Sequence, residues 1–388
     1  MSLRIGFLVS HPIQYYAPIF RALAERCDLT VFFAHRQTAE GQAKAGYGVT
    51  FQWDVDLLSG YDSRYLTNVA RQPSTDLFAG CDTPGIAQEI EQGRFDAFLV
   101  PGWGLKSYLQ AARACRRARV PVLVRGDSQL ASQRGGALRM AKALAFPLFL
   151  RRFDGFLYVG QRNREYLQHY GVRPDRLFFS PHCIDNEAFR AGGEAVRSQS
   201  PRDPNRPARL LFVGKLVDSK RPFDLLEAAT KVQGRRVEVA FAGAGEAEAR
   251  LKQAAAAAGV ATVFHGFVNQ SELPAVYAAA DIIVSPSVET WGLVVNEAMA
   301  CGLPAVVSDA VGCGPNLIEE GATGAVFPLG DTAGFARAIE RVLGLDPVRS
   351  RAALAAKMTV YSPERTAQGI MDAAAAFAAG HRQPDARL

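Results

Sequence analysis

Two glutamates in the second half of the chain have the spacing and the setting to bind a polar ligand. Glu289 follows a predicted strand at 282–285, and Glu297 lies in the early turns of a helix that begins near Trp291 and Gly292. A buried carboxylate can accept hydrogen bonds from two hydroxyl groups of a ribose or a hexose, at about 1.5–3 kcal/mol each. The N–H groups at the helix start favour an anion, and a glycine there lets the backbone approach a ligand closely.

Two lysines supply positive charge for the anionic end of such a ligand. Lys215 and Lys220 both lie in the loop that starts with Gly214, after a predicted strand at 210–213. A positive pair there would neutralise the charge that develops on a departing diphosphate. Gly243, after the next strand, eases close backbone packing near the phosphates, but its Gly-x-Gly lacks the rest of the dinucleotide fingerprint. Glutamates near a helix start and lysines in a loop are often merely solvated; their joint occurrence in this order favours a binding site.

Two series of short apolar runs alternate with helical segments and must position these residues. Runs rich in Val, Leu, Ile and Phe are typical of parallel strands that are covered on both faces. Their alternation with helices predicts an α/β fold, namely two doubly wound parallel sheets, each in a Rossmann-like domain. The predicted strands are 3–10, 29–34, 95–101, 120–125, 154–160 and 177–180, then 209–213, 237–242, 262–265, 282–285, 305–308 and 324–327.

The boundary between the two series is marked by composition. A stretch rich in Gly, Ser, Arg and Pro at 191–207 predicts a linker between a domain at 1–190 and a domain at 208–362. An alanine-rich helix at about 363–380 is expected to pack back on the first domain. Because ligands of such sheets bind outside the carboxyl ends of the strands, the chemistry is expected in the strand-end loops, with the two domains facing each other across a cleft.

The same motifs resemble a known family. The segment that runs from Glu289 to 309, ETWGLVVNEAMACGLPAVVSD, looks like the E-x7-E signature of retaining glycosyltransferase family 4, which has the GT-B fold. VGKLVDSKRPFDLLEA at 213–228 resembles that family's phosphate-binding segment, with Lys215 where the family usually has arginine. SPHCIDNEAF at 180–189 is similar to the segment that enters the linker, and FHGFVNQSEL at 264–273 to the loop beside the nucleotide base.

The resemblance implies roles for individual residues. Glu297 would hold the ribose, Glu289 the transferred sugar, and Lys215 and Lys220 the diphosphate. The implied reaction is transfer of a hexose from a nucleotide-diphosphate sugar to a saccharide or polyprenyl-linked acceptor, in polysaccharide synthesis at the cell surface. The remaining residues implied on the donor side are Gly214, Trp291, Gly292, Leu293, Gly243 and Phe267.

Three residues at strand ends of the first half are candidates on the acceptor side. His11 follows the first strand and can orient the acceptor or relay a proton, or it is a structural loop histidine. Asp127 follows the strand 120–125 and can act as acceptor base, bind a donor hydroxyl or pair with Arg125. Trp103 can stack on a sugar ring or pack at the base of its loop.

Charge is concentrated in the first half. Residues 113–152 hold ten basic residues and one acid, Asp127, which suggests a polyanionic partner. Arg134–Phe153 is basic and apolar together, so it is expected either to dock on an anionic membrane or to be an ordinary helix with basic flanks. No aromatic-interleaved basic groove points to nucleic acid. The N-terminus lacks a signal-peptide layout, so we expect a cytoplasmic protein, either free or at the inner face of the membrane.

A departing diphosphate needs charge neutralisation more than protonation, which lysines and a helix start can supply. The sequence has no convincing Asp-x-Asp motif or histidine cluster for a metal and no CxxC pair, so we expect neither a metal ion nor a cofactor. Attack from the front face, with retention at the anomeric carbon, is the expected course. The alternatives are a GT-B sugar-nucleotide epimerase, an inverting transferase, or a non-catalytic nucleotide-sugar-binding protein. A nicotinamide dehydrogenase is disfavoured because its fingerprint is missing after the first strand.

Overall fold

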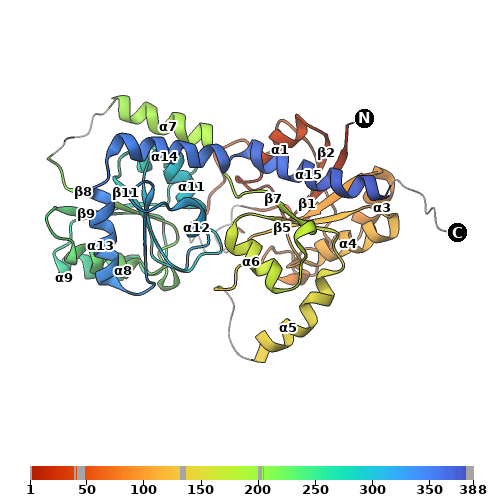
Figure 1. Ribbon diagram of the computed structural model, residues 1–388, viewed down its shortest axis with the longest axis horizontal. Helices are drawn as coiled ribbons and strands as arrows, with labels where there is room; N and C mark the ends of the chain where they lie inside the picture. Colours follow the sequence, from red (N-terminus) through yellow and green to blue (C-terminus); the bar gives the residue numbers. More distant parts are fainter. Residues whose placement is uncertain are drawn as a thin grey trace. The chain divides into compact units, whose positions relative to one another are not determined.

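The computed structural model describes residues 2–38, 41, 49–131, 137–199, 203 and 205–381. The chain divides into two compact units, which are discontinuous in sequence. The first holds residues 1–41, 56–182 and 363–388, and the second holds residues 42–55 and 183–362. Each unit contains one parallel sheet with helices on both of its faces (Figure 1).

The first unit is built on a seven-stranded sheet in the order β3-β2-β1-β4-β5-β6-β7. Helices α3 and α4 pack together, and α1 packs against the C-terminal helix α15. The elements are β1 (Arg4–Val9), α1 (Ala17–Ala24), β2 (Asp28–Phe33), β3 (Asp62–Tyr65), η2 (Phe78–Gly80), α3 (Ile86–Gly93), β4 (Ala97–Val100), α4 (Lys106–Ala118), β5 (Val122–Gly126), α5 (Ala137–Leu150), β6 (Gly155–Tyr158), α6 (Gln161–His169), η3 (Pro174–Arg176), β7 (Leu177–Phe179) and α15 (Pro363–His381).

The second unit is built on a six-stranded sheet in the order β10-β9-β8-β11-β12-β13. Helices α8, α9 and α13 form one layer, and α7, α10, α11 and α14 form another. The elements are α7 (Asn186–Gln199), β8 (Ala208–Val213), η4 (Asp218–Lys220), α8 (Pro222–Lys231), β9 (Val237–Ala242), α9 (Glu248–Ala258), β10 (Thr262–Gly266), α10 (Leu273–Ala278), β11 (Ile282–Ser285), α11 (Leu293–Ala300), β12 (Ala305–Ser308), α12 (Gly314–Leu317), β13 (Gly324–Phe327), α13 (Thr332–Leu343) and α14 (Pro347–Val360).

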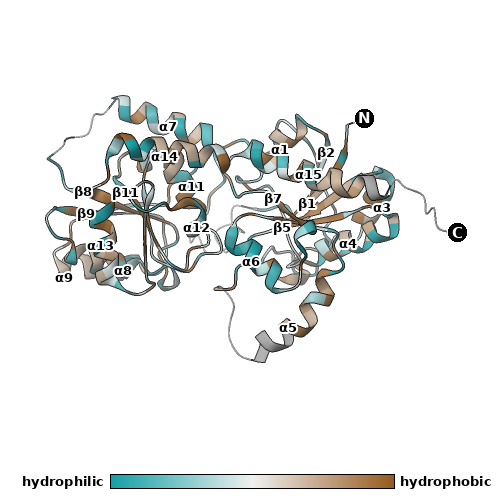
Figure 2. Ribbon diagram, viewed as in Figure 1, coloured by the Kyte–Doolittle hydropathy of each residue, from teal (hydrophilic) through white to brown (hydrophobic). Residues whose placement is uncertain are grey.

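The strands form where the apolar runs predicted them, because both faces of each sheet are covered. β4, β11 and β12 are buried at every residue, and Figure 2 shows hydrophobic colour along the central strands of both sheets. The sequence analysis did not find β3. Its residues, DSRY, are polar and alternate between exposed and half-buried positions, as suits a short strand at the edge of a sheet.

The segment expected to be a linker from residue 191 instead begins within a helix. α7 continues to Gln199 and packs on α10 and α11. Its two glycines, which suggested a linker, permit close contact: a Cβ atom on Gly192 would lie 2.7 Å from Pro274, and one on Gly193 would lie 3.3 Å from Cys301. The glycines therefore serve helix packing.

The helix at the end of the described chain completes the first unit. Thr366 donates a hydrogen bond from Oγ1 to the carbonyl of Pro181 (2.7 Å), and Ser180 Oγ donates to the carbonyl of Thr366 (3.2 Å). A Cβ atom on Gly369 would lie 2.0 Å from the carbonyl oxygen of Phe179. The backbones of α15 and of the segment after β7 therefore lie in direct contact.

Candidate active site

Both sheets reverse their strand order at one point, and that point is where such sheets bind ligands. In the second unit the reversal lies between β8 and β11, which are hydrogen-bonded neighbours. The loop after β8 carries Lys215 and Lys220, and the loop after β11 carries Glu289. The topology therefore brings residues about 70 positions apart in sequence to one edge of one sheet.

The structure joins two of the predicted site residues in an ion pair. Lys220 Nζ lies 2.6 Å from Glu289 Oε1 and 2.7 Å from Oε2. The side chains are 33% and 19% exposed respectively, so the pair is partly shielded from water yet accessible to a ligand. Ser287 Oγ also donates to Glu289 Oε1, at 2.6 Å. An ammonium and a carboxylate are thus held together at the sheet edge where ligands of such folds bind.

The loop that carries Glu289 is fixed by backbone contacts to the loop after β12. Gly312 N donates to the carbonyl of Glu289 (3.0 Å), and Cys313 N donates to that of Trp291 (2.9 Å). A Cβ atom on Gly312 would lie 1.9 Å from the carbonyl of Thr290. Because two backbones are in contact here, the carboxylate is presented on a rigid support.

Helix α11 starts directly after this loop. Gly292 precedes it in a left-handed conformation (φ 101°), and no side chain caps the helix start, whose first residue is Leu293. The indole of Trp291 is buried and donates from Nε1 to Asn296 Oδ1 at 2.8 Å. Since that side chain faces the interior, Trp291 can contact a ligand only through its backbone.

Glu297 is more deeply buried than Glu289. Its side chain is 1% exposed, and its Oε2 accepts a hydrogen bond from the hydroxyl of Tyr277 on α10 at 2.6 Å. A buried carboxylate is a strong hydrogen-bond acceptor once it is reached. The ribose-binding role of Glu297 stays a prediction.

Two glycines pack the loops at the carboxyl ends of β8 and β9 against each other. Gly214 and Gly243 have φ values of 145° and 143°, and a Cβ atom on Gly243 would lie 1.9 Å from the carbonyl oxygen of Gly214. The loop that carries Lys215, which is half-buried, therefore depends on glycine at position 243 for its path.

We expect Gly243→Ala to destabilise the protein by about 2–6 kcal/mol, because it adds both a backbone clash and a strained φ angle. Gly234→Ala is the matched control: its φ is 72°, but nothing lies within 4 Å of the added Cβ atom, so it should cost only about 1–2 kcal/mol. Thermal unfolding of the two variants measures the difference. Equal losses would show that the close packing of Gly243 is unimportant.

The loop predicted to lie beside the nucleotide base contacts a distant segment of the chain. The ring of Phe267 lies 4.3 Å from that of Phe51, centroid to centroid, and Asn269 Nδ2 donates to the carbonyl of Gln52 at 2.7 Å. Ser271 N donates to Asp54 Oδ1 at 3.1 Å. Sequence reasoning missed Phe51, because its segment lies in irregular structure between two strands and has no local signal.

At the reversal point of the first sheet, between β1 and β4, lies His11. Ser10 Oγ lies 3.0 Å from its Nδ1. Burial, and secondarily the nearby His35, lower the pKa of His11 to about 4, against a smaller opposite effect of Asp76. The imidazole is therefore neutral at pH 7 and able to accept a hydrogen bond.

This pKa gives a pH dependence of stability. Between pH 6.5 and about 4 the unfolded chain binds a proton at His11 that the folded chain does not. The free energy of unfolding therefore falls as the pH drops through this window. We expect His11→Asn to lose less stability than the wild type between pH 7.5 and 5, as measured by urea midpoints. Parallel losses in both proteins would contradict a depressed pKa at position 11.

Asp127 follows β5, and its carboxylate lies 3.7 Å from His182 Nε2. Arg125, the partner considered for it, is buried and donates to Ser180 Oγ (3.2 Å) and to the carbonyl of Pro181 (2.8 Å). Burial lowers the pKa of His182, while the hydrogen bond to Asp127 raises it. Sequence reasoning missed His182, although it also follows a strand end, the rule that selected Asp127.

Trp103 packs into an aromatic cluster. Its ring centroid lies 5.2 Å from that of Phe146, 6.0 Å from Phe149 and 6.3 Å from Phe153. This environment is that of a packing residue at the base of its loop, and a role in acceptor binding stays a prediction.

Among the described residues, no three His, Cys, Asp or Glu side chains lie close enough together to hold a metal ion. Within the same residues, no helix combines the length and the apolar character needed to cross a bilayer.

The two sheets define a GT-B fold. A structure of Anabaena Alr3699/HepE in complex with UDP is similar with a TM-score of 0.68 at 18% identity, and the match covers 95% of this chain and 99% of that one. The apo lipopolysaccharide outer core galactosyltransferase WaaB matches with a TM-score of 0.69 at 14% identity, over 95% of this chain and 99% of that one.

A family model matches the part of the chain that holds the ion pair. Residues 195–359 match the family model "Glycosyl transferases group 1". A D-inositol 3-phosphate glycosyltransferase of Geodermatophilus obscurus is 33% identical over 229 residues, which are 55% of this chain and 50% of that protein. D-inositol 3-phosphate glycosyltransferase 2 of Catenulispora acidiphila is 35% identical over 197 residues, 47% of this chain and 46% of that protein. The chain thus spans about half the length of the curated relatives it matches.

Proposed function

We propose that this chain is a retaining glycosyltransferase of family 4, which transfers a hexose from a nucleotide-diphosphate sugar to a saccharide or lipid-linked saccharide. The observation that carries the proposal is the ion pair of Lys220 and Glu289, which lies where the strand order of the second sheet reverses. The match of residues 195–359 to a family model of glycosyl transferases supports it.

The donor is assigned to the loops after β8, β9, β10 and β11. Glu289 would accept hydrogen bonds from hydroxyl groups of the transferred sugar, and Glu297 from the ribose. Lys215, Lys220 and the start of α11 would neutralise the diphosphate. Close backbone contacts would come from five further residues, and a ring contact to the base from a sixth: Gly214, Gly243, Trp291, Gly292, Leu293 and Phe267.

The reaction breaks the bond between the anomeric carbon and the diphosphate oxygen, and forms a bond from that carbon to the acceptor oxygen on the same face. The transition state is oxocarbenium-like. Negative charge grows on the departing diphosphate, where the ammonium of Lys220 stabilises it most. The acceptor proton passes to the departing diphosphate oxygen, so this course needs no protein nucleophile and no metal ion.

The first unit is assigned to the acceptor. His11 is neutral at pH 7 and lies at the reversal point of its sheet, so it would orient an acceptor hydroxyl or relay its proton to the departing diphosphate. Asp127, next to His182, and Trp103 are the further candidates there. The protein would work in the cytoplasm, in the synthesis of a surface polysaccharide.

The relatives indicate which substrates to try first. The Anabaena protein was crystallised with UDP and with UDP-glucose, which makes UDP-sugars the first donors. The curated relatives are named for D-inositol 3-phosphate, which belongs in the acceptor panel beside saccharides and polyprenyl-linked saccharides.

Thermal-shift measurements against UDP-, GDP-, TDP- and ADP-sugars test donor binding. We expect one base to give a clear stabilisation, which follows from preferential binding to the folded state. NMR of the product then tests the reaction: an α-linked product from an α-linked donor supports retention. A β-linked product would mean inversion, an altered free donor would mean epimerisation, and tight binding without turnover over the whole panel would leave only a binding protein.

A further inference from the structure

Helix α4 presents a row of cations on its outer face. Its buried residues include Tyr108, Ala111 and Cys115, which face the core of the first unit. Arg113, Arg116 and Arg117 are exposed and spaced three and four positions apart, so they share the opposite face.

A pocket of about 840 Å³ lies along this outer face. No acidic residue is among those that line it, and Arg152, which precedes β6, extends the row of cations. Arginine guanidinium groups match the geometry of phosphate oxygens and bind them through pairs of hydrogen bonds. The lining residues are Phe78, Lys106, Leu109, Gln110, Ala112, Arg113, Arg116, Arg117, Arg152 and Phe153.

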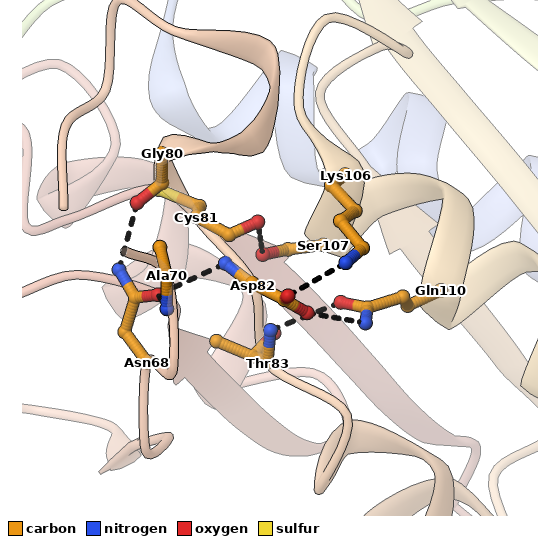
Figure 3. A network of polar contacts seen from close by, with 9 residues as sticks. All are labelled: Asn68, Ala70, Gly80, Cys81, Asp82, Thr83, Lys106, Ser107 and Gln110. Carbon is orange, nitrogen blue, oxygen red and sulfur yellow. Dashed lines mark hydrogen bonds and ion pairs between the residues drawn. The ribbon is translucent and has the colours of Figure 1, made fainter. Parts of the chain in front are cut away.

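Two residues that line the pocket, Lys106 and Gln110, belong to a polar network (Figure 3). Asp82 accepts hydrogen bonds from Lys106 Nζ at 2.6 Å and from Gln110 Nε2 at 2.7 Å. Asn68 Nδ2 donates to the carbonyl of Gly80 at 2.9 Å. These bonds fix the loop that carries Phe78, whose ring is 53% exposed. Because Asp82 pairs with Lys106, the uncompensated positive charge lies in the C-terminal half of α4.

The pocket is separate from the strand-end loops that carry the candidate acceptor residues. The last turn of α4 comes just before β5, and Arg152 comes just before β6. These positions lie toward the amino ends of the strands, whereas His11 and Asp127 follow carboxyl ends. The arginines are therefore not explained by the transfer reaction.

The helix that leads into Arg152 exposes large apolar side chains. On α5, Leu144 is 81% exposed and Leu148 is 62% exposed, and their spacing of four residues places them on one face. Figure 1 shows α5 projecting from the first unit, and Figure 2 shows hydrophobic residues in its C-terminal half. Arg151 and Arg152 follow directly and are exposed. Exposed apolar side chains beside a cluster of cations are typical of a surface that enters an anionic membrane interface.

We propose that the outer face of α4 and the C-terminal half of α5 dock on an anionic lipid bilayer. The arginines of α4 and Arg152 bind lipid phosphates in the pocket, while Leu144 and Leu148 enter the boundary between headgroups and acyl chains. Charge complementarity selects this occupant, since the pocket is lined by four arginines and by no acidic residue, and a neutral partner would leave that positive charge unbalanced.

Vesicle co-sedimentation of the full chain tests the proposal, with phosphatidylcholine vesicles and with vesicles that also contain phosphatidylglycerol. At about 0.1 M salt, where the Debye length is about 10 Å, we expect binding only to the anionic vesicles. Arg113→Gln/Arg116→Gln/Arg117→Gln should weaken the partition coefficient about 100-fold, at about 1 kcal/mol for each arginine. Leu144→Ser/Leu148→Ser should weaken it about tenfold or more.

The matched control is Arg349→Gln/Arg351→Gln, which removes two exposed arginines from α14 of the second unit and should leave vesicle binding unchanged. Equal binding to both vesicle types, no binding to either, or full binding by the triple arginine variant would overturn the proposal. So would stabilisation by inorganic pyrophosphate that depends on these arginines without any vesicle binding, because the pocket would then hold a small anion. None of these outcomes depends on glycosyl transfer.

Discussion

Glu289→Gln is expected to lower kcat for sugar transfer by about 10²–10⁴-fold, the loss of two charge-assisted hydrogen bonds to sugar hydroxyls at about 1.5–3 kcal/mol each. Glutamine keeps the shape of the side chain and can still accept from Lys220 and Ser287, which both contact Glu289 now. The fold should therefore persist, with a thermal midpoint close to that of the wild type. Steady-state kinetics with saturating donor, together with circular dichroism, measure both quantities.

The control for this substitution is Glu91→Gln, which makes the same chemical change at an exposed position of α3. It should change kcat by less than about twofold, as expected for a surface position. Wild-type turnover by Glu289→Gln would remove this carboxylate from the mechanism. A loss of folding by Glu289→Gln would instead mean that its main role is structural.

Lys220→Met is expected to lower kcat by about 10²–10³-fold, the usual effect of removing one group that stabilises developing negative charge. Donor affinity should change less, because the charge on the diphosphate grows in the transition state. Lys220→Arg should retain part of the activity, since it keeps the charge but not the compact ammonium. Single-turnover kinetics separate the chemical step from donor binding.

Lys252→Met is the matched control for Lys220→Met. Lys252 is exposed on α9 and pairs with Glu248 one turn away, so its loss should cost only about 0.3–0.5 kcal/mol of stability and no activity. If Lys220→Met weakens donor binding and leaves kcat unchanged, the ammonium binds ground state and transition state equally. A kcat within about threefold of the wild type would exclude the proposed charge stabilisation.

The ion pair also implies that the two variants are not independent. The ammonium of Lys220 contacts both carboxylate oxygens of Glu289, so a donor must exchange that contact for its own diphosphate and hydroxyl groups. Residues in contact show coupling energies of about 0.5–3 kcal/mol in double-mutant cycles. The combined Lys220→Met and Glu289→Gln variant should therefore lose less activity than the product of the single losses.

The order of strands and helices was largely predictable, because continuous apolar runs of five or six residues are typical of strands in a parallel sheet that is covered on both faces. Every predicted strand overlaps an observed one. One observed strand, β3, was not predicted, because it is polar and lies at the edge of the sheet, where a strand needs no run of buried apolar residues. The glycines of α7 led to the wrong prediction of a linker. The sequence alone does not distinguish a glycine that makes the backbone flexible from one that makes room for Pro274.

Part of the candidate site could likewise be predicted from the sequence, and part of it could not. Lys220 and Glu289 could be placed at one edge from strand order alone, since their loops follow neighbouring strands of a doubly wound sheet. Phe51 could not, because its contact with Phe267 joins segments more than 200 residues apart with no regular element at one end. The deep position of Glu297 against Tyr277 likewise depends on how α10 and α11 pack.

Helix α15 determines when the first unit can finish folding. That unit takes most of its chain from residues before 183, yet α15 contributes Ile370, Ala373 and Ala374, all fully buried. On the ribosome, the opening half must therefore wait, with part of its apolar surface uncovered, until the second unit has been synthesised. A chain cut before Pro363 should expose that surface permanently and aggregate, even though every residue proposed to touch the donor would still be present.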